Sequence, residues 1–573
     1  MTPTPSNRTL IIGLDAATWS LMRPLIRAGE LPNLAALIAQ GSSATLRSCI
    51  QPSSEQAWPT MTTGLNCGSH GLYGYMRRRP GSYVHDYVNA RFLRAPQLWD
   101  WLSRWGREVI VANVPLTYPP HPVNGVLITG FMAPGTHTEF TYPADLYDEL
   151  RRHVGDYTIN VDIERGGLDR REENLADLVA QFRQMTEQRT AAVEYLARTR
   201  PWDFLMVVFV SLDRLGHKFW RYTDSSHPLY TPAGNRRWGS VLSDTYRQLD
   251  AQVGRLLKLA SDEDTVLVVS DHGFGPLTHA VYLNRWLEQR GYLANRSPDS
   301  QGAGDRARRL GTAALRKAVQ RVQHPLVATA KQRAFERFPA LRGQLHSAMA
   351  YAHLDWTRTQ VYAVGTMGNF YVNLQGREPQ GIVAPGAAYE ALRDRLIADL
   401  RELCDPQSGQ PIFEGVWRRE EIYHGPYLDE APDAIGLMDP RYHGAVVDWR
   451  ASGDAIVEPL GDELLFLADL SGQHTLDGIL IARGPGIRQG AESPPQQIAD
   501  VTATVLYRMG HAVPAQLDGR VVTDMLEDDW LVDHPVRYLE EAQPGVQKPA
   551  TGDGYSAAEE ELIEQRLGGL GYL

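Results

Sequence analysis

Residues 265–273, Thr265-Val-Leu-Val-Val-Ser-Asp271-His272-Gly273, decide the fold of this chain. The stretch begins with a continuous apolar run and ends abruptly in a carboxylate, an imidazole and a glycine. Such a run is typical of a strand that is buried on both faces of a parallel sheet. Because ligands collect at the carboxyl ends of such strands, the stretch predicts an α/β protein with a site at that edge.

Similar apolar runs recur along the chain, with amphipathic stretches of helical length between them. This alternation is the pattern of an α/β protein with a largely parallel sheet, which the last run is expected to rejoin. Residues 175–198 and 387–403 have the spacing of helices. The other expected strands span residues 10–14, 109–112, 125–128, 204–210 and 478–482.

The composition is that of a globular protein with a large core: 573 residues, 43% hydrophobic and 22% charged. A net charge of −11 argues against polyanion binding by the whole surface, and we expect no sequence-specific nucleic-acid partner. The three cysteines, Cys49, Cys67 and Cys404, suit neither a disulfide framework nor a thiolate zinc site. The start resembles no signal peptide, and the longest apolar run, Phe204 to Val210, is too short to span a bilayer. We therefore expect a cytoplasmic protein without a transmembrane segment; a homo-oligomer is compatible with these features.

Residues 301–345 differ from the rest, because they carry ten Lys and Arg but only Asp305 and Glu336 as acids. Interleaved small and apolar residues predict one or two basic amphipathic helices. Two interpretations stay open: a solvated helical insertion, or a surface that contacts an anionic membrane or substrate.

Five segments are expected along the chain. In the last of them, the C-terminal tail, Ser556 and Glu559 are expected to form a capping box at the start of a helix that ends at about Leu567. The expected segments are a first core part (1–295), a basic helical insertion (296–355), a cap (356–465), a second core part (466–530) and the tail (531–573).

Three expected strands end in a carboxylate: Asp15 after the first, Asp213 after a short turn, and Asp271 directly after Ser270. One such Asp is often only a helix N-cap. Three of them at one sheet edge, two with a histidine nearby, indicate a site.

Histidines accompany these carboxylates. In Asp213-Arg-Leu-Gly-His217 the two side chains are four residues apart, around a glycine that is expected to let the backbone bend. Asp271-His272 is a second pair, and His474 precedes the last strand. Nitrogen and carboxylate ligands suit zinc, with manganese as the alternative. Six ligands suit two divalent ions roughly 4 Å apart, which can clamp an in-line displacement at phosphorus.

Ser54 is the candidate nucleophile. In Gln51-Pro-Ser-Ser54-Glu-Gln-Ala-Trp58 a turn enters a helix, where a serine presents its hydroxyl and free backbone N–H groups to a phosphate. The alternative is a plain N-cap. A serine oxygen bound to a metal ion loses its proton readily, so no separate histidine base is required.

Together these residues resemble the alkaline phosphatase superfamily. The chain is most similar to its type I phosphodiesterase/nucleotide pyrophosphatase branch, and within that to a predicted phosphohydrolase/phosphomutase group. Residues 373–383 and 567–573 carry the narrower likeness. The motifs that carry the broader one are Asp15, Ser54 ahead of Thr63-Gly64, His70-Gly71, Asp213-x-x-x-His217, Asp271-His272-Gly273 and His474.

The resemblance implies an alkaline phosphatase-like three-layer sandwich with a mostly parallel central sheet, an inserted cap and the basic insertion. It implies metal-dependent hydrolysis of a phosphoric ester through a covalent phosphoseryl-type intermediate on Ser54, with a diester or pyrophosphate as the first expectation. The implied ligands are Asp213, His217 and His474 for one ion and Asp15, Asp271 and His272 for the other.

Differences between this sequence and the motifs of related enzymes narrow the range of expected substrates. Nucleotide pyrophosphatases usually carry a threonine nucleophile and a later asparagine that contacts phosphate. Here the nucleophile position is Ser54 and no asparagine follows before Asn66, which argues against a nucleotide diester. Gln56 and Trp58 replace the Pro and Arg of a sulfatase motif, which argues against a sulfatase.

Substrate contacts are predicted from Trp58, Arg377 and His443, each with the alternative of an ordinary structural role. The substrate is expected to be a small phosphorylated or phosphodiester compound. A phosphomonoesterase or a phosphomutase could use the same site, and an inactive scaffold is the non-enzymatic alternative.

Overall fold

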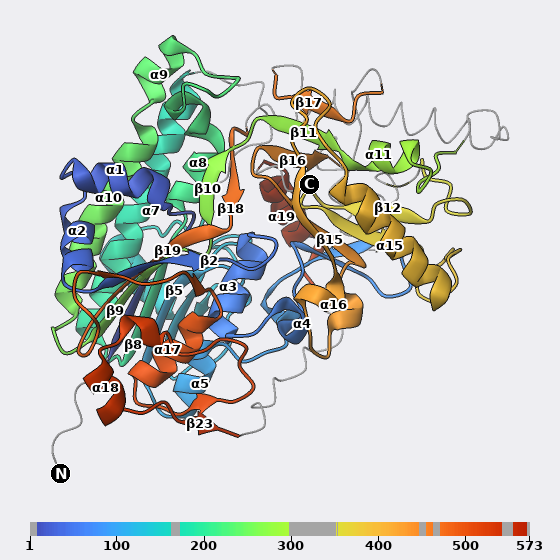
Figure 1. Ribbon diagram of the computed structural model, residues 1–573. Coiled ribbons are helices and arrows are strands. Elements are labelled where there is room, and N and C mark those ends of the chain that lie inside the picture. The colour runs from blue at the N-terminus through green and yellow to red at the C-terminus, as the bar shows by residue number, and fades with distance from the viewer. Residues whose placement is uncertain are drawn as a thin grey trace.

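A ten-stranded sheet forms the centre of the molecule in the computed structural model (Figure 1). The structure describes residues 8–161, 172–296, 351, 353–445, 454–461, 470–540 and 554–569. The predicted basic helices at 301–345 lie outside these residues. The strand order is β20-β2-β19-β9-β1-β8-β5-β6-β7, with β21 beside β2. The strands are β1 (Thr9–Leu14), β2 (Ser42–Arg47), β5 (Val109–Val114), β6 (Gly125–Thr129), β7 (Thr141–Tyr142), β8 (Phe204–Phe209), β9 (Thr265–Val269), β19 (Asp477–Arg483), β20 (Ala491–Glu492) and β21 (Gln496–Gln497).

The centre of the sheet is parallel, as the sequence predicts: β9, β1, β8, β5 and β6 all run in one direction. β19 rejoins the sheet as expected but runs antiparallel to both β9 and β2. This confirms the α/β class and the mostly parallel sheet.

Helices cover both faces of the sheet because successive residues of a strand point to opposite sides. In β1, Leu10 and Ile12 belong to one apolar cluster and Ile11 to the other. The first cluster includes side chains of α1 (Trp19–Arg27), α2 (Pro32–Ala39), α6 (Leu146–Val154) and α10 (Val241–Leu256). The second includes side chains of α3 (Ser54–Thr63), α5 (Leu98–Arg104) and α17 (Asp500–Arg508). α7 (Glu172–Thr199) contributes to both.

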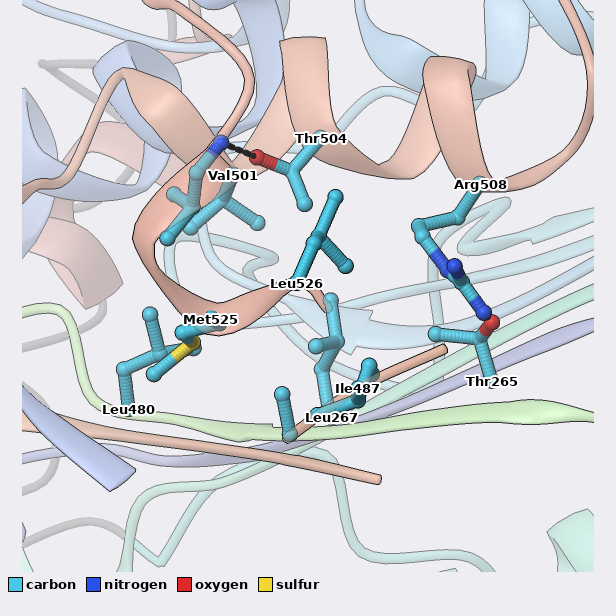
Figure 2. A pocket seen from close by; sticks show the side chains of 11 residues that line it. Thr265, Leu267, Leu480, Ile487, Val501, Thr504, Arg508, Met525 and Leu526 are labelled. Atoms are coloured by element: carbon cyan, nitrogen blue, oxygen red, sulfur yellow. Dashed lines mark hydrogen bonds between the residues drawn. The ribbon is translucent and has the colours of Figure 1, made fainter. Parts of the chain in front are cut away.

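The packing of α17 against β9 and β19 is close (Figure 2). Only a hollow of about 20 Å³ remains between them, lined mostly by apolar side chains. At its edge, Arg508 donates to Thr265 Oγ1 and to the carbonyl oxygen of Pro485. The residues around this hollow are therefore part of the apolar core.

A second unit, the cap, packs beside the core and is built around a four-stranded antiparallel sheet (Figure 1). α11 (Leu283–Gln289) belongs to the apolar cluster of the cap, although the sequence analysis assigns residues 1–295 to the core. The domain limits stay a prediction. The cap elements are β12 (Val361–Val364), β13 (Asn369–Val372), β15 (Ala434–Met438), β14 (Phe413–Arg418) and α15 (Ala387–Arg401), with a smaller sheet of β16 (Tyr442–Ala445), β11 (His279–Tyr282) and β17 (Val457–Pro459).

A hairpin of the core, β3 (Met76–Arg78) and β4 (His85–Tyr87), reaches the cap. At its tip the ring of Tyr83 stacks on that of Trp356, with centroids 3.7 Å apart, and its hydroxyl donates to Asn373 Oδ1 over 2.8 Å. A second pair of strands, β10 (Gly273–Pro276) and β18 (Gly472–Thr475), leaves the sheet edge beside the site.

The C-terminal helix α19 (Ala557–Gly569) begins at the expected capping box. Ser556 N donates to Glu559 Oε2 over 2.7 Å, and Glu559 N donates to Ser556 Oγ over 3.4 Å. Figure 1 shows α19 returning between the core and the cap. In the described part of the chain, no helix is long and apolar enough to cross a bilayer.

Candidate active site and metal centre

Three carboxylates meet at the carboxyl edge of the sheet. Asp15 follows β1, Asp271 follows β9, and Asp213 lies in the first turn of α8 (Ser211–Thr223), the helix that follows β8. Because β9, β1 and β8 are neighbours in parallel register, these three positions share one edge. All three carboxylates are completely buried.

His217 lies one helical turn beyond Asp213. The sequence predicted a bend at the intervening glycine, but α8 is continuous, and the i, i+4 spacing itself places both side chains on one face. Gly216 serves a different purpose: a Cβ there would lie 2.8 Å from Phe274 Cε1. The glycine therefore lets β10 approach the helix.

His474 completes this group from β18, where it pairs with Phe274 of β10. Its Nε2 lies 3.0 Å from Asp213 Oδ1 and 3.1 Å from His217 Nε2. Two imidazole nitrogens and one carboxylate oxygen thus converge from separate elements.

All three histidines have the same orientation. Their Nδ1 atoms lie 2.9–3.0 Å from the carbonyl oxygens of Gly472 (His217), Gly273 (His272) and Pro52 (His474). A carbonyl oxygen can only accept, so each Nδ1 carries the proton and each Nε2 presents its lone pair to the site. This is the tautomer that metal-binding histidines require.

The side chains form two groups that could each hold a metal ion. One consists of Asp213, His217 and His474, the first set predicted from the sequence. The other consists of Asp15, Asp213 and His272, so Asp213 is shared. Asp271, predicted for the second ion, lies beside this group, with Oδ2 3.2 Å from His272 Nε2.

The residues fit divalent cations. In the described part of the chain, Asp15 Oδ1 and Asp271 Oδ2 are buried and accept no hydrogen bond. Buried carboxylate oxygens without partners are rare unless an ion or water satisfies them. Carboxylate oxygens with imidazole nitrogens and no thiolate are a donor set that zinc accepts.

Without cations the carboxylates disfavour one another's charge. Burial and the neighbouring Asp213 raise the pKa of Asp271 to about 8. Burial, with the charges of Asp271 and Asp213, also raises the pKa of Asp15 well above its usual range. Burial acts on Asp213 in the same direction, but Arg214 and two histidines hold its pKa well below the ordinary value.

Burial favours the neutral form of two of the imidazoles, those of His272 and His474. Burial and the neighbouring His272 lower the pKa of His474 to about 3, and burial lowers that of His272. A neutral imidazole can bind a cation without first losing a proton.

Ser54 is the first residue of α3 and is almost completely buried. Its Oγ lies 3.3 Å from His272 Nε2. Ser53 precedes the helix as N-cap, but its hydroxyl bonds Glu55 and makes no cap to the backbone. The structure thus brings the candidate nucleophile to the second metal group.

Trp58 lies beneath the site. Its indole is buried and Nε1 donates to Asp15 Oδ2 over 3.1 Å. A Cβ on Gly13 would lie 2.7 Å from Trp58 Cη2, so the ring packs directly on β1. From this position Trp58 orients Asp15. Such a structural role is the alternative to the predicted substrate contact.

The other predicted substrate contacts lie in the cap. His443 of β16 is buried, and its Nδ1 accepts from Gln473 Nε2 over 2.7 Å, next to His474. Arg377 forms a bidentate ion pair with Asp433 over 2.8 and 2.6 Å, within the cap. Arg377 thus already has carboxylate partners, whereas His443 adjoins the metal centre.

Sequence reasoning missed two residues of the site. Arg214 is buried, with Nη1 3.1 Å from Asp213 Oδ2. Gln473 Oε1 accepts from the backbone N–H of His474 over 3.1 Å. The signal for both was their place next to a metal ligand, since neighbours of ligands often fix them.

Fold and site together define a class: an α/β protein whose buried Asp and His side chains, gathered at the sheet edge beside a helix N-terminus, can hold metal ions. The model of the type I phosphodiesterase/nucleotide pyrophosphatase family matches residues 9–455, and the chain belongs to this family. The resemblance seen in the sequence motifs is thereby confirmed. No curated protein sequence matches the chain.

Two of the solved structures that resemble this chain have low sequence identity to it. Phosphonoacetate hydrolase from Sinorhizobium meliloti 1021 is 15% identical over 88% of this chain and 96% of its own, with a TM-score of 0.51. Murine ectonucleotide pyrophosphatase/phosphodiesterase 5 is 13% identical over 91% of this chain and 100% of its own, with a TM-score of 0.47. At such identity the likeness concerns the fold alone.

Proposed function

We propose that this protein is a metal-dependent phosphoric ester hydrolase, acting on a diester or pyrophosphate, with Ser54 as its nucleophile. The observation that carries the proposal is the convergence of two metal-binding groups and the Ser54 hydroxyl at one sheet edge. Family membership supports the reaction class.

Two divalent ions would be held by Asp213, His217 and His474 and by Asp15, Asp271 and His272. When bound, they would neutralise the carboxylates, lower the pKa of the Ser54 hydroxyl and stabilise charge on the phosphoryl oxygens. Zinc is the expected ion, and manganese is the alternative.

The chain's own residues position the reaction. The site holds Ser54 Oγ at the entry of α3, where the helix dipole favours a phosphate. Ser54 Oγ would form a bond to phosphorus as the bond to the leaving oxygen breaks, and its proton would pass to solvent. Water would then hydrolyse the phosphoseryl ester and return the serine.

The test is hydrolysis of a bis-aryl phosphodiester and an aryl phosphomonoester, measured with zinc, with manganese and with chelator. We expect metal-dependent turnover, faster on the diester, that falls at least a thousandfold in Ser54→Ala. The hydroxyl of Ser53 bonds Glu55, so turnover should fall less than tenfold in the control variant Ser53→Ala.

Each alternative has its own outcome in this assay. Faster hydrolysis of the monoester would identify a phosphomonoesterase. Isomerisation of a phosphosugar without phosphate release would identify a phosphomutase. Unchanged turnover in Ser54→Ala would overturn the nucleophile assignment, and a chain that binds no metal would be an inactive scaffold.

A further inference from the structure

The C-terminal helix α19 lies outside residues 9–455, which the family model matches, yet its Arg566 lines a small cavity together with Arg214, the neighbour of Asp213. Its apolar side chains Ile563 and Leu567 are completely buried in the cluster that covers one face of the sheet. The helix is therefore part of the core.

Three polar contacts join this segment to one loop, residues 130–134, which follows β6 at the carboxyl edge of the sheet. Tyr555, just before the helix, donates its hydroxyl to the Met132 carbonyl oxygen over 2.8 Å. Arg566 donates to the carbonyl oxygens of Ala133 and Pro134, over 2.7 and 3.2 Å. Both side chains are buried, so these contacts take the place of water.

The loop needs such support. Met132 has φ +82, a left-handed conformation that is unfavourable for a residue with a side chain. Hydrogen bonds from buried partners can hold the loop in this state.

The other side of the loop reaches the metal centre. The Phe131 ring lies 4.0 Å from Arg214 Cζ, and Arg214 Nη1 lies 3.1 Å from Asp213 Oδ2. Arg214 and Arg566 also line the same cavity of about 10 Å³. A continuous series of contacts thus joins α19 to Asp213, the carboxylate that both metal-binding groups share.

We propose that α19 is a positioning element of the metal centre: through Arg566 and residues 130–134 it fixes Arg214, and Arg214 orients Asp213. The inference rests on the metal centre proposed above. Partners one step beyond a metal ligand change metal affinity about 10–100-fold, so we expect an effect at the lower end of that range for α19.

The test measures zinc affinity of the full-length chain after chelator treatment, by competition with a chromophoric chelator. Arg566→Met keeps the side chain's length but loses both donors, and should weaken zinc binding about tenfold. Amide exchange at Gly130 and Ala133 should also become faster. The matched control is Arg508→Met, which removes a buried arginine that donates to a carbonyl oxygen on the opposite face of the sheet and should leave zinc affinity unchanged.

The outcomes separate this proposal from the proposed function. If wild type binds no zinc, the metal centre itself is wrong. If wild type binds zinc and folded Arg566→Met binds it equally well, α19 is structural only and the proposal is overturned. Should Arg566→Met not fold, Tyr555→Phe decides instead, because it removes the hydroxyl that contacts the carbonyl oxygens of Met132 and Val88 and keeps the ring. Weaker zinc binding supports the proposal and unchanged binding overturns it.

Discussion

At the metal centre, the histidines are oriented by the backbone. Each donates its Nδ1 proton to a carbonyl oxygen, which directs the lone pair of Nε2 into the site. These contacts could not be read from the sequence, because they join His474 to Pro52 and His217 to Gly472, far apart along the chain. The convergence of Asp15, Asp213 and Asp271 could be predicted, because each comes just after a strand that a local apolar pattern reveals.

The stability of the metal-free protein should depend on pH through Asp271. Its pKa is raised from about 3.9 to about 8, so the folded chain holds the proton more tightly than the unfolded chain. This contribution is fully present below about pH 4 and is lost as the pH rises through about 8. Asp271→Asn, which mimics the neutral acid, should therefore gain a few kcal/mol over wild type between these pH values.

Urea unfolding of chelator-treated protein across this range measures the difference. The exposed Asp262→Asn should follow wild type at every pH. Parallel pH profiles for Asp271→Asn and wild type would show that Asp271 is not held protonated.

Trp58 should matter for metal binding as well as for stability. Trp58→Phe removes the donor to Asp15 Oδ2 and leaves a buried carboxylate oxygen with one partner fewer, at a cost of about 1–3 kcal/mol. We expect zinc affinity to fall about 10–100-fold in a competition titration. Trp99→Phe is the matched control, since that buried indole has no hydrogen-bond partner in the described structure. Equal zinc affinity in Trp58→Phe and Trp99→Phe would remove Trp58 from the site.

At the scale of elements, the apolar runs predicted six strands of the central sheet, and all six are present. The sequence analysis missed β2, because Ser42-Ser-Ala-Thr-Leu-Arg47 has no continuous apolar run. It also gave no direction for β19, since a strand's orientation depends on partners distant in sequence. The capping box of α19 was visible because both of its residues are local.

The approach of β10 to α8 should be sensitive to one methyl group. Gly216→Ala would gain about 1 kcal/mol from helix propensity. Its Cβ, however, would lie 2.8 Å from the Phe274 ring, and overpacking costs about 1–3 kcal/mol. We expect a net loss of stability in thermal unfolding, with weaker zinc binding because His217 and His474 shift. Gly461→Ala, which meets no atom within 4 Å, should change neither, and a stabilised Gly216→Ala would refute the close packing.

At the scale of the whole molecule, the cap is tied to the core by the β3–β4 hairpin. The hairpin contributes the stacking of Tyr83 on Trp356 and an ion pair between Arg78 and Glu378. The sequence suggested a cap but not this attachment, because both contacts join residues more than 250 positions apart.

Tyr83→Ala should loosen the cap without unfolding the core. Loss of the aromatic pair costs about 0.5–1.5 kcal/mol beyond the lost buried area. Amide exchange should become faster in β12 and β13 and stay unchanged in β1, β8 and β9. Tyr83→Phe keeps the stacking and should show a smaller change. Equal acceleration in the central sheet would mean that cap and core unfold together.

The central claim is that Ser54 attacks phosphorus between two metal-binding groups. The most direct test is mass spectrometry of the zinc-loaded protein, quenched with acid during turnover of a bis-aryl phosphodiester and digested to peptides. We predict a phosphoryl-ester adduct on Ser54 in wild type and none in chelator-treated protein. An adduct on another residue, or no adduct together with undiminished turnover in Ser54→Ala, would contradict the account.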